Sequence, residues 1–284
     1  MTKTCRKPLK TLAAAALTAA CTFAGAGAAS AADMPASVPS VAEAFTFSTT
    51  EIQFQMGRLK NPFAASGATK AWTPIVTLQH ASSWVFGDVF FFIDFLDDKH
   101  RDGFNDEDAY GELYLYFSSA KLLGMKYGGA LKDVGIVAGV NAGADPDYRG
   151  YLPGVYLDWN VPGFAFFRTQ FTALIDDSKK NGGNGSQKDG WQADASFAAP
   201  FELAGQYFSF EGHIEYTENS RNKTYNSKMK DWILAQPQLR WDAGYALTGK
   251  KDVFFLGTEY QFWMNKLGTN VDESRFQGLA VVRF

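Results

Sequence analysis

The stretch GDVFFFIDF, residues 87–95, alternates between two kinds of side chain. Its odd positions after Gly87 are all apolar, whereas its even positions are two aspartates and two phenylalanines, namely Asp88, Phe90, Phe92 and Asp94. Because successive side chains of a β-strand point to opposite faces, a period of two predicts a strand with one apolar face and one mixed face.

The same alternation recurs along most of the chain. Clear examples are residues 110–117, 164–175, 208–217, 233–242 and 253–263, weaker ones are 45–54, 74–80, 134–141, 151–159 and 191–199, and a closing strand covers 275–284. About twelve strands result, most of them nearer ten residues than the ~5–6 typical of soluble proteins. That length matches a tilted strand crossing a bilayer.

The connections and the chain end support a membrane barrel. Long polar connections are expected at 56–71, 97–108, 176–190 and 218–230, with shorter ones at 81–86 and 160–163, although 119–133 is long for a turn. Outer-membrane barrels alternate long outer loops with short periplasmic turns. The chain closes on Phe284 after an alternating apolar face, as the last strand of such barrels usually does. We therefore predict an all-β, antiparallel up-and-down transmembrane β-barrel of about 12 strands; a soluble sandwich is the alternative that periodicity alone leaves open.

The first 32 residues predict a secretory signal peptide, and residues 33–284 the barrel. Four basic residues precede an apolar run from Leu12 to Phe23, and small residues continue to Ala32. The apolar run is shorter than the ~20 residues of a membrane anchor. A lipoprotein signal ending at Cys21 is the other alternative.

Composition excludes several classes of protein. The chain has 25 Phe, 12 Tyr and 7 Trp, too many aromatic residues for a disordered protein. Removing residues 1–32 would take away both cysteines, which excludes a disulfide scaffold. It would also change the formal net charge from −3 to −7, which disfavours nucleic acid as a partner.

With the apolar face toward lipid, the polar face would line a lumen. The residues expected to line it and to contact a solute are Asp88, Phe90, Phe92, Asp94, Glu112, Tyr114, Tyr116, Arg168, Glu211, Arg240, Glu259 and Gln261. Carboxylates outnumber arginines among the inward positions, which favours neutral or cationic solutes. Rings beside carboxylates suit a planar solute that carries hydroxyl groups. Alternatively, the rings only fill a narrow barrel and the charges pair with each other.

Seven segments resemble the Tsx-like nucleoside-specific outer-membrane channels and their OmpK relatives. They are WTPIVTLQHASSWVFGDVFFFIDF (72–95), DAYGELYLYFSSAKLLG (108–124), YLPGVYLDWNVPGF (151–164), PFELAGQYFSFEG (200–212), LAQPQLRWDAG (234–244), GTEYQFWMNKLG (257–268) and VDESRFQGLAVVRF (271–284). The resemblance implies a monomeric twelve-stranded barrel in the outer membrane of a Gram-negative bacterium, with a narrow pore for nucleosides. Some members of that family also serve as phage receptors through exposed loops.

Three other functions remain open from the residues alone: a general small-solute porin, a loop-mediated adhesion or phage-receptor barrel, and a lipid-modifying outer-membrane enzyme. The enzyme would need a histidine, and the chain has His80, His100 and His213. His80 lies near Ser82, and His213 alternates with Glu211 and Glu215, which is a weak metal signal. We expect no catalytic residues, no cofactor and no metal, with outer-membrane lipid and a small solute as the partners.

Overall fold

The computed structural model describes residues 45–64, 69–98, 100–144, 147–178, 188–218, 221–222 and 227–284. These residues belong to one compact unit, Glu43–Phe284. The predicted signal peptide lies outside the described residues, and so do the tips of several loops.

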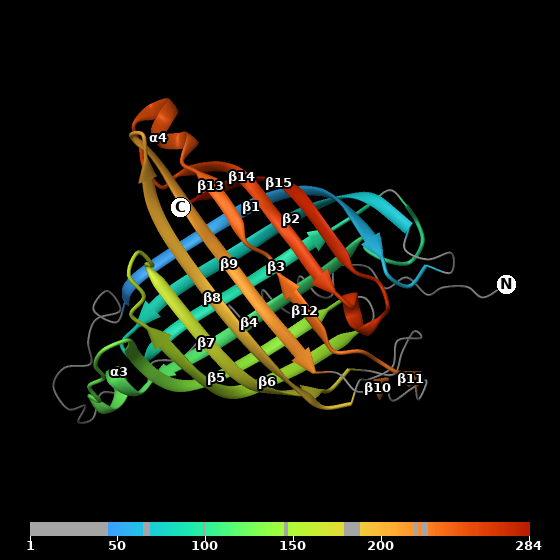
Figure 1. Cartoon of the computed structure of the whole chain (residues 1–284), viewed down its shortest axis with the longest axis horizontal. Helices are drawn as coiled ribbons and strands as arrows, with labels where there is room; N and C mark the ends of the chain where they lie inside the picture. Colours follow the sequence, from blue (N-terminus) through green and yellow to red (C-terminus); the bar gives the residue numbers. More distant parts are fainter. Residues whose placement is uncertain are drawn as a thin grey trace, which may run out of the picture. The chain divides into compact units, whose positions relative to one another are not determined.

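Twelve antiparallel strands close into a barrel within this unit (Figure 1). Nine follow in order: β1 (Phe45–Asn61), β2 (Thr69–Trp84), β3 (Gly87–Leu96), β4 (Asp108–Ser118), β5 (Leu131–Gly143), β6 (Tyr148–Trp159), β7 (Phe166–Asp176), β8 (Gly190–Leu203) and β9 (Gln206–Glu218). The tenth is interrupted and consists of β12 (Trp232–Ala235) and β13 (Gln238–Trp241), and the last two are β14 (Phe254–Met264) and β15 (Glu273–Arg283). The predicted fold and strand number are confirmed.

The barrel is closed by β15, which pairs with β14 on one side and with β1 on the other. The closing register brings Ile52 opposite Val282, and the two backbone hydrogen bonds between Thr50 and Phe284 measure 3.1 and 2.9 Å. The C-terminal aromatic residue therefore completes the ladder that joins the first strand to the last. Closure removes the unpaired edge that an open sheet would expose.

The two ends of the barrel carry different connections. At the end where β1 begins and β15 finishes, here called the terminal end, lie the connections 85–86, 119–130, 160–165, 204–205 and 242–253, with the short helices α3 (Ser119–Leu123) and α4 (Ala243–Thr248). At the opposite end, here called the loop end, lie the described parts of the connections 62–68, 97–107, 144–147, 177–189, 219–231 and 265–272. They include the hairpin β10 (Arg221–Asn222) and β11 (Ser227–Lys228) and the turn η1 (Lys266–Gly268) (Figure 1). The terminal-end connections 119–130 and 242–253 are thus long as well, and only the length of the first is expected from the sequence. None of the described helices is long and apolar enough to cross a membrane.

Three expected boundaries are wrong. The connection expected at 81–86 is only residues 85–86, because β2 continues to Trp84. The polar connection expected at 56–71 is mostly strand, because β1 continues to Asn61 and β2 starts at Thr69 with unbroken pairing between them. The strand expected at 233–242 is broken in the middle. Asp242 leaves the strand and caps α4, accepting from Tyr245 N at 2.8 Å.

The break between β12 and β13 has a local cause. Pro237 has no backbone N–H to donate to a neighbouring strand. Opposite it, Gly212 has a φ of +146° and lies so close to the Gln236 carbonyl and Pro237 that a side chain would collide with them. The Pro237 carbonyl nevertheless accepts from Tyr260 N at 2.9 Å, so the strand resumes after one irregular step.

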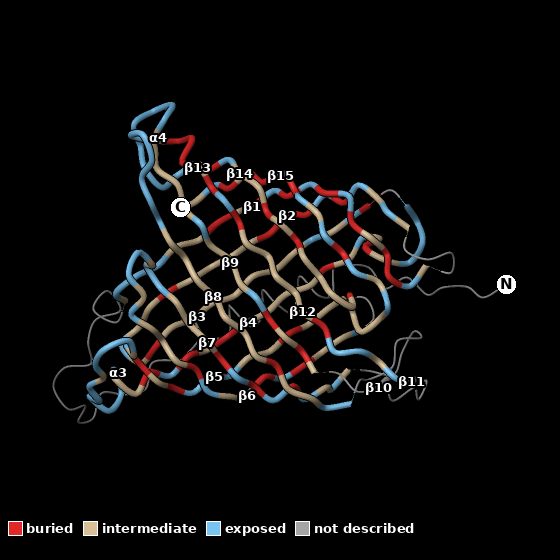
Figure 2. Tube along the Cα trace, viewed as in Figure 1, coloured by how far each residue is buried: buried red, intermediate tan, exposed pale blue. Residues whose placement is uncertain are grey.

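The outer face of the wall is apolar, as the alternation predicts. Large apolar side chains are exposed along most strands, for example Phe54, Trp72, Ile136, Phe171 and Phe276, and burial alternates along the strands in Figure 2. Rings gather near both ends. Trp191 lies between Phe171 and Tyr216 at centroid distances of 5.1 and 4.9 Å at the loop end, and Phe86 lies between Trp84 and Phe117 at 5.9 and 6.0 Å at the terminal end. An apolar band between two aromatic girdles is the lipid-facing surface of a membrane barrel.

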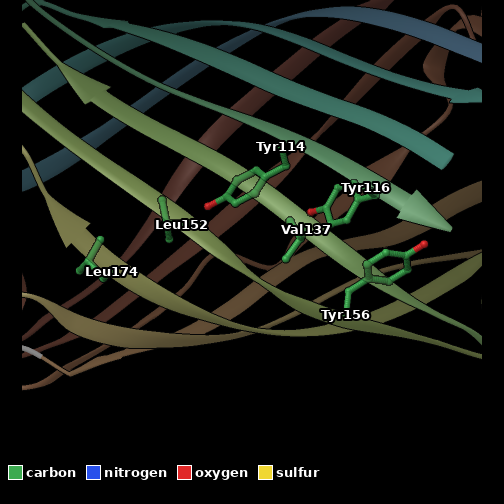
Figure 3. Packing of buried hydrophobic residues seen from close by; sticks show 6 residues of the cluster. All are labelled: Tyr114, Tyr116, Val137, Leu152, Tyr156 and Leu174. Atoms are coloured by element: carbon green, nitrogen blue, oxygen red, sulfur yellow. The ribbon is translucent and has the colours of Figure 1, made fainter. Parts of the chain in front are cut away.

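Inside the barrel, four neighbouring strands carry an apolar cluster. Its six members come from β4, β5, β6 and β7 and are Tyr114, Tyr116, Val137, Leu152, Tyr156 and Leu174 (Figure 3). Glycines on β5 make room for the rings: Gly135 lies directly beneath Tyr156, and Gly139 lies beneath Tyr114. The rings therefore lie flat against the wall instead of reaching across the lumen.

The variant Gly135→Ala tests this packing. A methyl group at this position would collide with the Phe117 carbonyl and the Tyr156 ring, so we expect the free energy of unfolding to fall by about 1–3 kcal/mol. Gly278→Ala is the matched control, because an added Cβ there meets no atom within 4 Å. Urea unfolding of the refolded barrel in lipid vesicles, followed by tryptophan fluorescence, measures both. Equal stability of the two variants would contradict the proposed fit.

Candidate functional site: the barrel lumen

All twelve candidate residues lie on the inner face of the wall, and several meet across strands that are not neighbours. Arg168 on β7 bonds Asp88 on β3, and Tyr116 on β4 donates to Gln170 on β7. Contacts that skip intervening strands are possible only through the interior of the barrel. The inward parity assigned from the sequence therefore agrees with the structure.

The mixed face of β3 stays partly accessible. Phe90 and Phe92 are half-buried, as are Asp88 and Asp94 beside them. From Phe90 a row of rings runs toward the loop end: Phe90 to Phe92 at 6.2 Å, Phe92 to Tyr110 at 6.1 Å, and Tyr110 to Tyr148 at 6.5 Å between centroids. We call these four residues the ring ladder. Tyr110 and Tyr148 were not among the expected site residues, although both occupy inward positions by parity.

Two of the expected aromatic residues have a different environment. Tyr114 and Tyr116 are each only 5% exposed and belong to the apolar cluster. Tyr114 stacks on Tyr116 at 6.1 Å, and Tyr116 meets the edge of Tyr156 at 5.2 Å. These two rings therefore fill space inside the barrel, which is the alternative role that the sequence left open for the inward aromatic residues.

Arg168 is the centre of an ionic cluster at the terminal end of the lumen. Its guanidinium binds Asp158 through two hydrogen bonds of 2.6 and 2.8 Å and Asp88 through one of 2.6 Å. It also lies over the rings of Tyr116 and Tyr156, at 4.0 and 4.5 Å from their centroids. Lys121 of α3 reaches in and places Nζ 3.1 Å from Asp88. The positive charge of Arg168 is therefore neutralised by groups of the wall itself.

A second ionic cluster, on the opposite side of the lumen, joins β13, β1, β9 and β15. Arg240 lies 3.0 Å from Glu51 and 3.1 Å from Glu211, and Arg283 lies 2.6 Å from Glu51. Arg240 and Glu51 are almost fully buried. Two arginines and two glutamates again balance each other, so this cluster presents little net charge to a solute.

Glu259 is surrounded by glutamine amides. It accepts hydrogen bonds from Gln55 at 2.9 Å, Gln238 at 2.8 Å, Gln277 at 2.8 Å and Gln236 at 3.3 Å. Gln261 takes part by accepting from Gln236 and Gln277. The side chains of this network come from β1, β13, β14 and β15 and from Gln236 in the break between β12 and β13, and they fill that side of the lumen with polar groups.

The contribution of β1 was missed by the sequence reasoning. Glu51, Gln53 and Gln55 are buried and bond to groups on β13 and β14, strands that are not neighbours of β1. The signal was present in the alternation EIQFQ at 51–55, in which every polar residue is inward. This signal is weak, because glutamine is uncharged and the alternation over residues 45–54 is less clear than in the other strands.

The loop-end half of the lumen is acidic. Asp94, which accepts from Thr77 Oγ1 at 2.5 Å, interacts electrostatically with Glu112 and with His213. His213 Nδ1 lies 3.3 Å from Asp194 Oδ2, and its Nε2 lies 3.0 Å from Gln236 Oε1. One ring nitrogen of His213 therefore faces a carboxylate oxygen and the other faces an amide oxygen. The ring is paired with Asp194, and the other carboxylates of this half lie around the pair.

A buried ion pair ties the loop-end turn η1 to the barrel rim. Lys266 binds the Glu273 carboxylate and donates to the Lys60 carbonyl at 2.9 Å. Burial lowers the pKa of the Lys266 ammonium, while the neighbouring Glu273 opposes this by favouring the charged form. The pair fixes where β14 turns into β15 and so holds the loop-end rim of the lumen.

The histidines do not assemble a hydrolytic site in the described residues. His80 is on the outer face, stacked on Phe91 at 5.3 Å, and its Nδ1 is 2.9 Å from Thr50 Oγ1. Ser82 Oγ accepts from Trp84 Nε1 instead of pairing with His80. Among the residues that the structure describes, no group of three or more His, Cys, Asp and Glu side chains is arranged to hold a metal ion.

No protein-family model and no curated protein matches the chain. Solved structures that align with it include porins and also the translocator domain of the autotransporter NalP from Neisseria meningitidis, which aligns over 97% of this chain and 95% of its own with 10% identity and a TM-score of 0.38. The KdgM porin aligns over 82% of this chain and 99% of its own, with 8% identity and a TM-score of 0.46. The NanC porin aligns over 81% and 98%, with 10% identity and a TM-score of 0.47, and a BenF-like porin from Pseudomonas fluorescens Pf-5 over 84% and 98%, with 9% identity and 0.42. At such identities the cargo of those proteins is no guide to the cargo of this chain.

The closed twelve-stranded wall, its apolar outer band and its polar interior together define the class of protein. The chain has the fold of an outer-membrane β-barrel with antiparallel strands.

The variant Arg168→Gln tests the terminal-end cluster. Losing the guanidinium leaves Asp88 and Asp158 facing each other with one partner fewer, so we expect the free energy of unfolding to fall by about 3–5 kcal/mol. Lys121→Gln, which removes the more exposed cation from the same Asp88, should cost less than about 1 kcal/mol. Urea unfolding in vesicles measures both, and a larger loss from Lys121→Gln than from Arg168→Gln would refute the central role of Arg168.

Proposed function

We propose that this barrel is an outer-membrane channel for the passive diffusion of small solutes, and that nucleosides are its preferred cargo. The nucleoside class comes from the resemblance of seven segments to the Tsx-like channels. Residues 1–32 would direct export and be removed, and the channel would act as a monomer without catalysis. Attachment of phage to the loop-end loops is part of the same expectation.

The observation that carries the proposal is the ring ladder. Its rings are half-buried on the inner face and follow one another at 6.1–6.5 Å between centroids. A planar base that stacks on one ring can move to the next without losing contact for more than one short step. Stacking of a base on an aromatic side chain contributes about 1–3 kcal/mol, which is enough to select a solute and too little to trap it.

Polar groups beside the ladder suit the sugar of a nucleoside. Glu112 lies next to Tyr110, whose hydroxyl donates to it at 2.6 Å, and Asp94 and Asp88 alternate with Phe92 and Phe90 along β3. Carboxylates accept hydrogen bonds from ribose hydroxyls. The lumen arginines are already paired with Asp88, Asp158, Glu51 and Glu211, so they offer little attraction to a phosphate. Neutral nucleosides should therefore pass more readily than nucleotides.

The double variant Phe90→Ala with Phe92→Ala tests the stacking role. In planar bilayers we expect nucleosides to block the single-channel current of the wild-type barrel, and the double variant to need roughly tenfold more nucleoside for half block. Open conductance should change less than block does, because the two rings are recognition elements rather than a seal.

The matched control is Phe91→Ala with Phe95→Ala, which removes two rings from the outer face of the same strand. Its block by nucleosides should equal that of the wild type. If sugars of equal size permeate as fast as nucleosides, the channel is a general small-solute porin and the nucleoside preference is wrong.

A further inference from the structure

Four side chains in the loop-end half of the lumen form a group of hydrogen-bond acceptors, here called the acceptor cluster: Glu112, Asn141, Gln192 and Glu215. Asn141 Nδ2 donates to Glu112 at 2.9 Å, and Gln192 Nε2 donates to Glu215 at 2.6 Å. Glu112 and Asn141 lie opposite each other on β4 and β5, and Gln192 and Glu215 lie on the paired strands β8 and β9. The two glutamates interact electrostatically, so the two amide–carboxylate pairs lie in the same part of the lumen.

The amide oxygens of this cluster have no hydrogen-bond partner within the described residues. The two atoms are Asn141 Oδ1 and Gln192 Oε1, and their residues are only 3% and 4% exposed. Each amide nitrogen is committed to a carboxylate, which fixes the orientation of the amide and leaves its oxygen beside that carboxylate. A buried acceptor without a donor costs free energy, so such atoms in a native protein call for a ligand or water that donates.

The charge of the two glutamates is also uncompensated. Among the described residues no basic side chain lies within ion-pair distance of Glu112 or Glu215. Neutral donors bind them instead, the Tyr110 hydroxyl at Glu112 and the Trp232 indole at Glu215. The nearby His213 ring lies against a different carboxylate, with Nδ1 3.3 Å from Asp194 Oδ2. By contrast, Glu51 and Glu211 at the terminal end are matched by arginines.

We infer that the acceptor cluster is a binding site for a solute that bears a protonated primary amine. An ammonium group supplies up to three N–H donors and one positive charge, which are the two things this cluster lacks. The cluster adjoins the ring ladder at Tyr110, so an amine with an apolar or planar body would place that body on the rings. The binding site itself does not depend on the proposed channel function; only the path by which the amine reaches the site does.

Calorimetric titration of the whole refolded barrel in detergent with n-butylamine, which is protonated at neutral pH, tests the site without requiring conduction. We expect binding to the wild type, no detectable binding of n-butanol, and affinity for the amine at least about tenfold weaker in Glu112→Gln and in Glu215→Gln. Both substitutions keep the shape of the side chain and remove its charge. Glu202→Gln, which removes an exposed charge near the terminal end, should bind like the wild type.

The possible outcomes separate the site from the channel. Retained heat-modifiable migration on gels verifies that each variant is folded. Equal affinity in the wild type and both glutamine variants, or no binding of the amine to the wild type, overturns the site. Binding that follows the expected pattern in a barrel that passes no current supports the site and overturns the channel.

Discussion

The rest of the structure depends on the backbone pairing that joins β15 to β1. In hydrocarbon every backbone N–H and C=O needs a partner within the protein, so a sheet is stable there only when its two edges meet. The hydrogen bonds between Thr50 and Phe284, and the register beside them, complete that ring. Once the sheet is closed, alternation gives each strand one lipid-facing side and one lumen-facing side, and the inward positions of twelve strands must fit one limited interior.

The inward polar side chains are paired in different ways at the two ends of the barrel interior. Toward the terminal end, arginines and carboxylates neutralise each other, with Arg168 between Asp88 and Asp158 and Arg240 against Glu51. Toward the loop end, carboxylates are held by neutral amides, hydroxyls and an indole, and acceptors exceed donors. The lumen therefore has an excess of hydrogen-bond acceptors toward the loop end and paired, neutralised charges toward the terminal end. For the proposed channel, such a gradient would favour neutral or cationic solutes over anions.

The sequence predicted the closed barrel, the strand number and the inward parity because alternation is a local property that each strand carries by itself. It predicted the lumen position of all twelve candidate residues for the same reason. It could not predict which inward groups meet, since the contact between Arg168 and Asp88 depends on the curvature of the whole wall. Nor could it distinguish the buried Tyr114 and Tyr116 from the half-buried Phe90 and Phe92. The burial of the two tyrosines depends on the apolar cluster, in which Gly139 makes room for Tyr114 and Gly135 for Tyr156. Pro237 can be read from the sequence, but the break that it causes between β12 and β13 also depends on Gly212 of the neighbouring strand β9.

Site-directed spin labelling along β3 tests the central claim, which is that even positions of this strand face a water-accessible lumen and odd positions face lipid. Both native cysteines lie in residues 1–32, so single cysteines can be placed one by one from Asp88 to Phe95 in the barrel region. In lipid vesicles the account predicts that a water-soluble nickel complex relaxes labels at 88, 90, 92 and 94, and that oxygen relaxes labels at 89, 91, 93 and 95. Loss of this alternation, or its reversal, would contradict it.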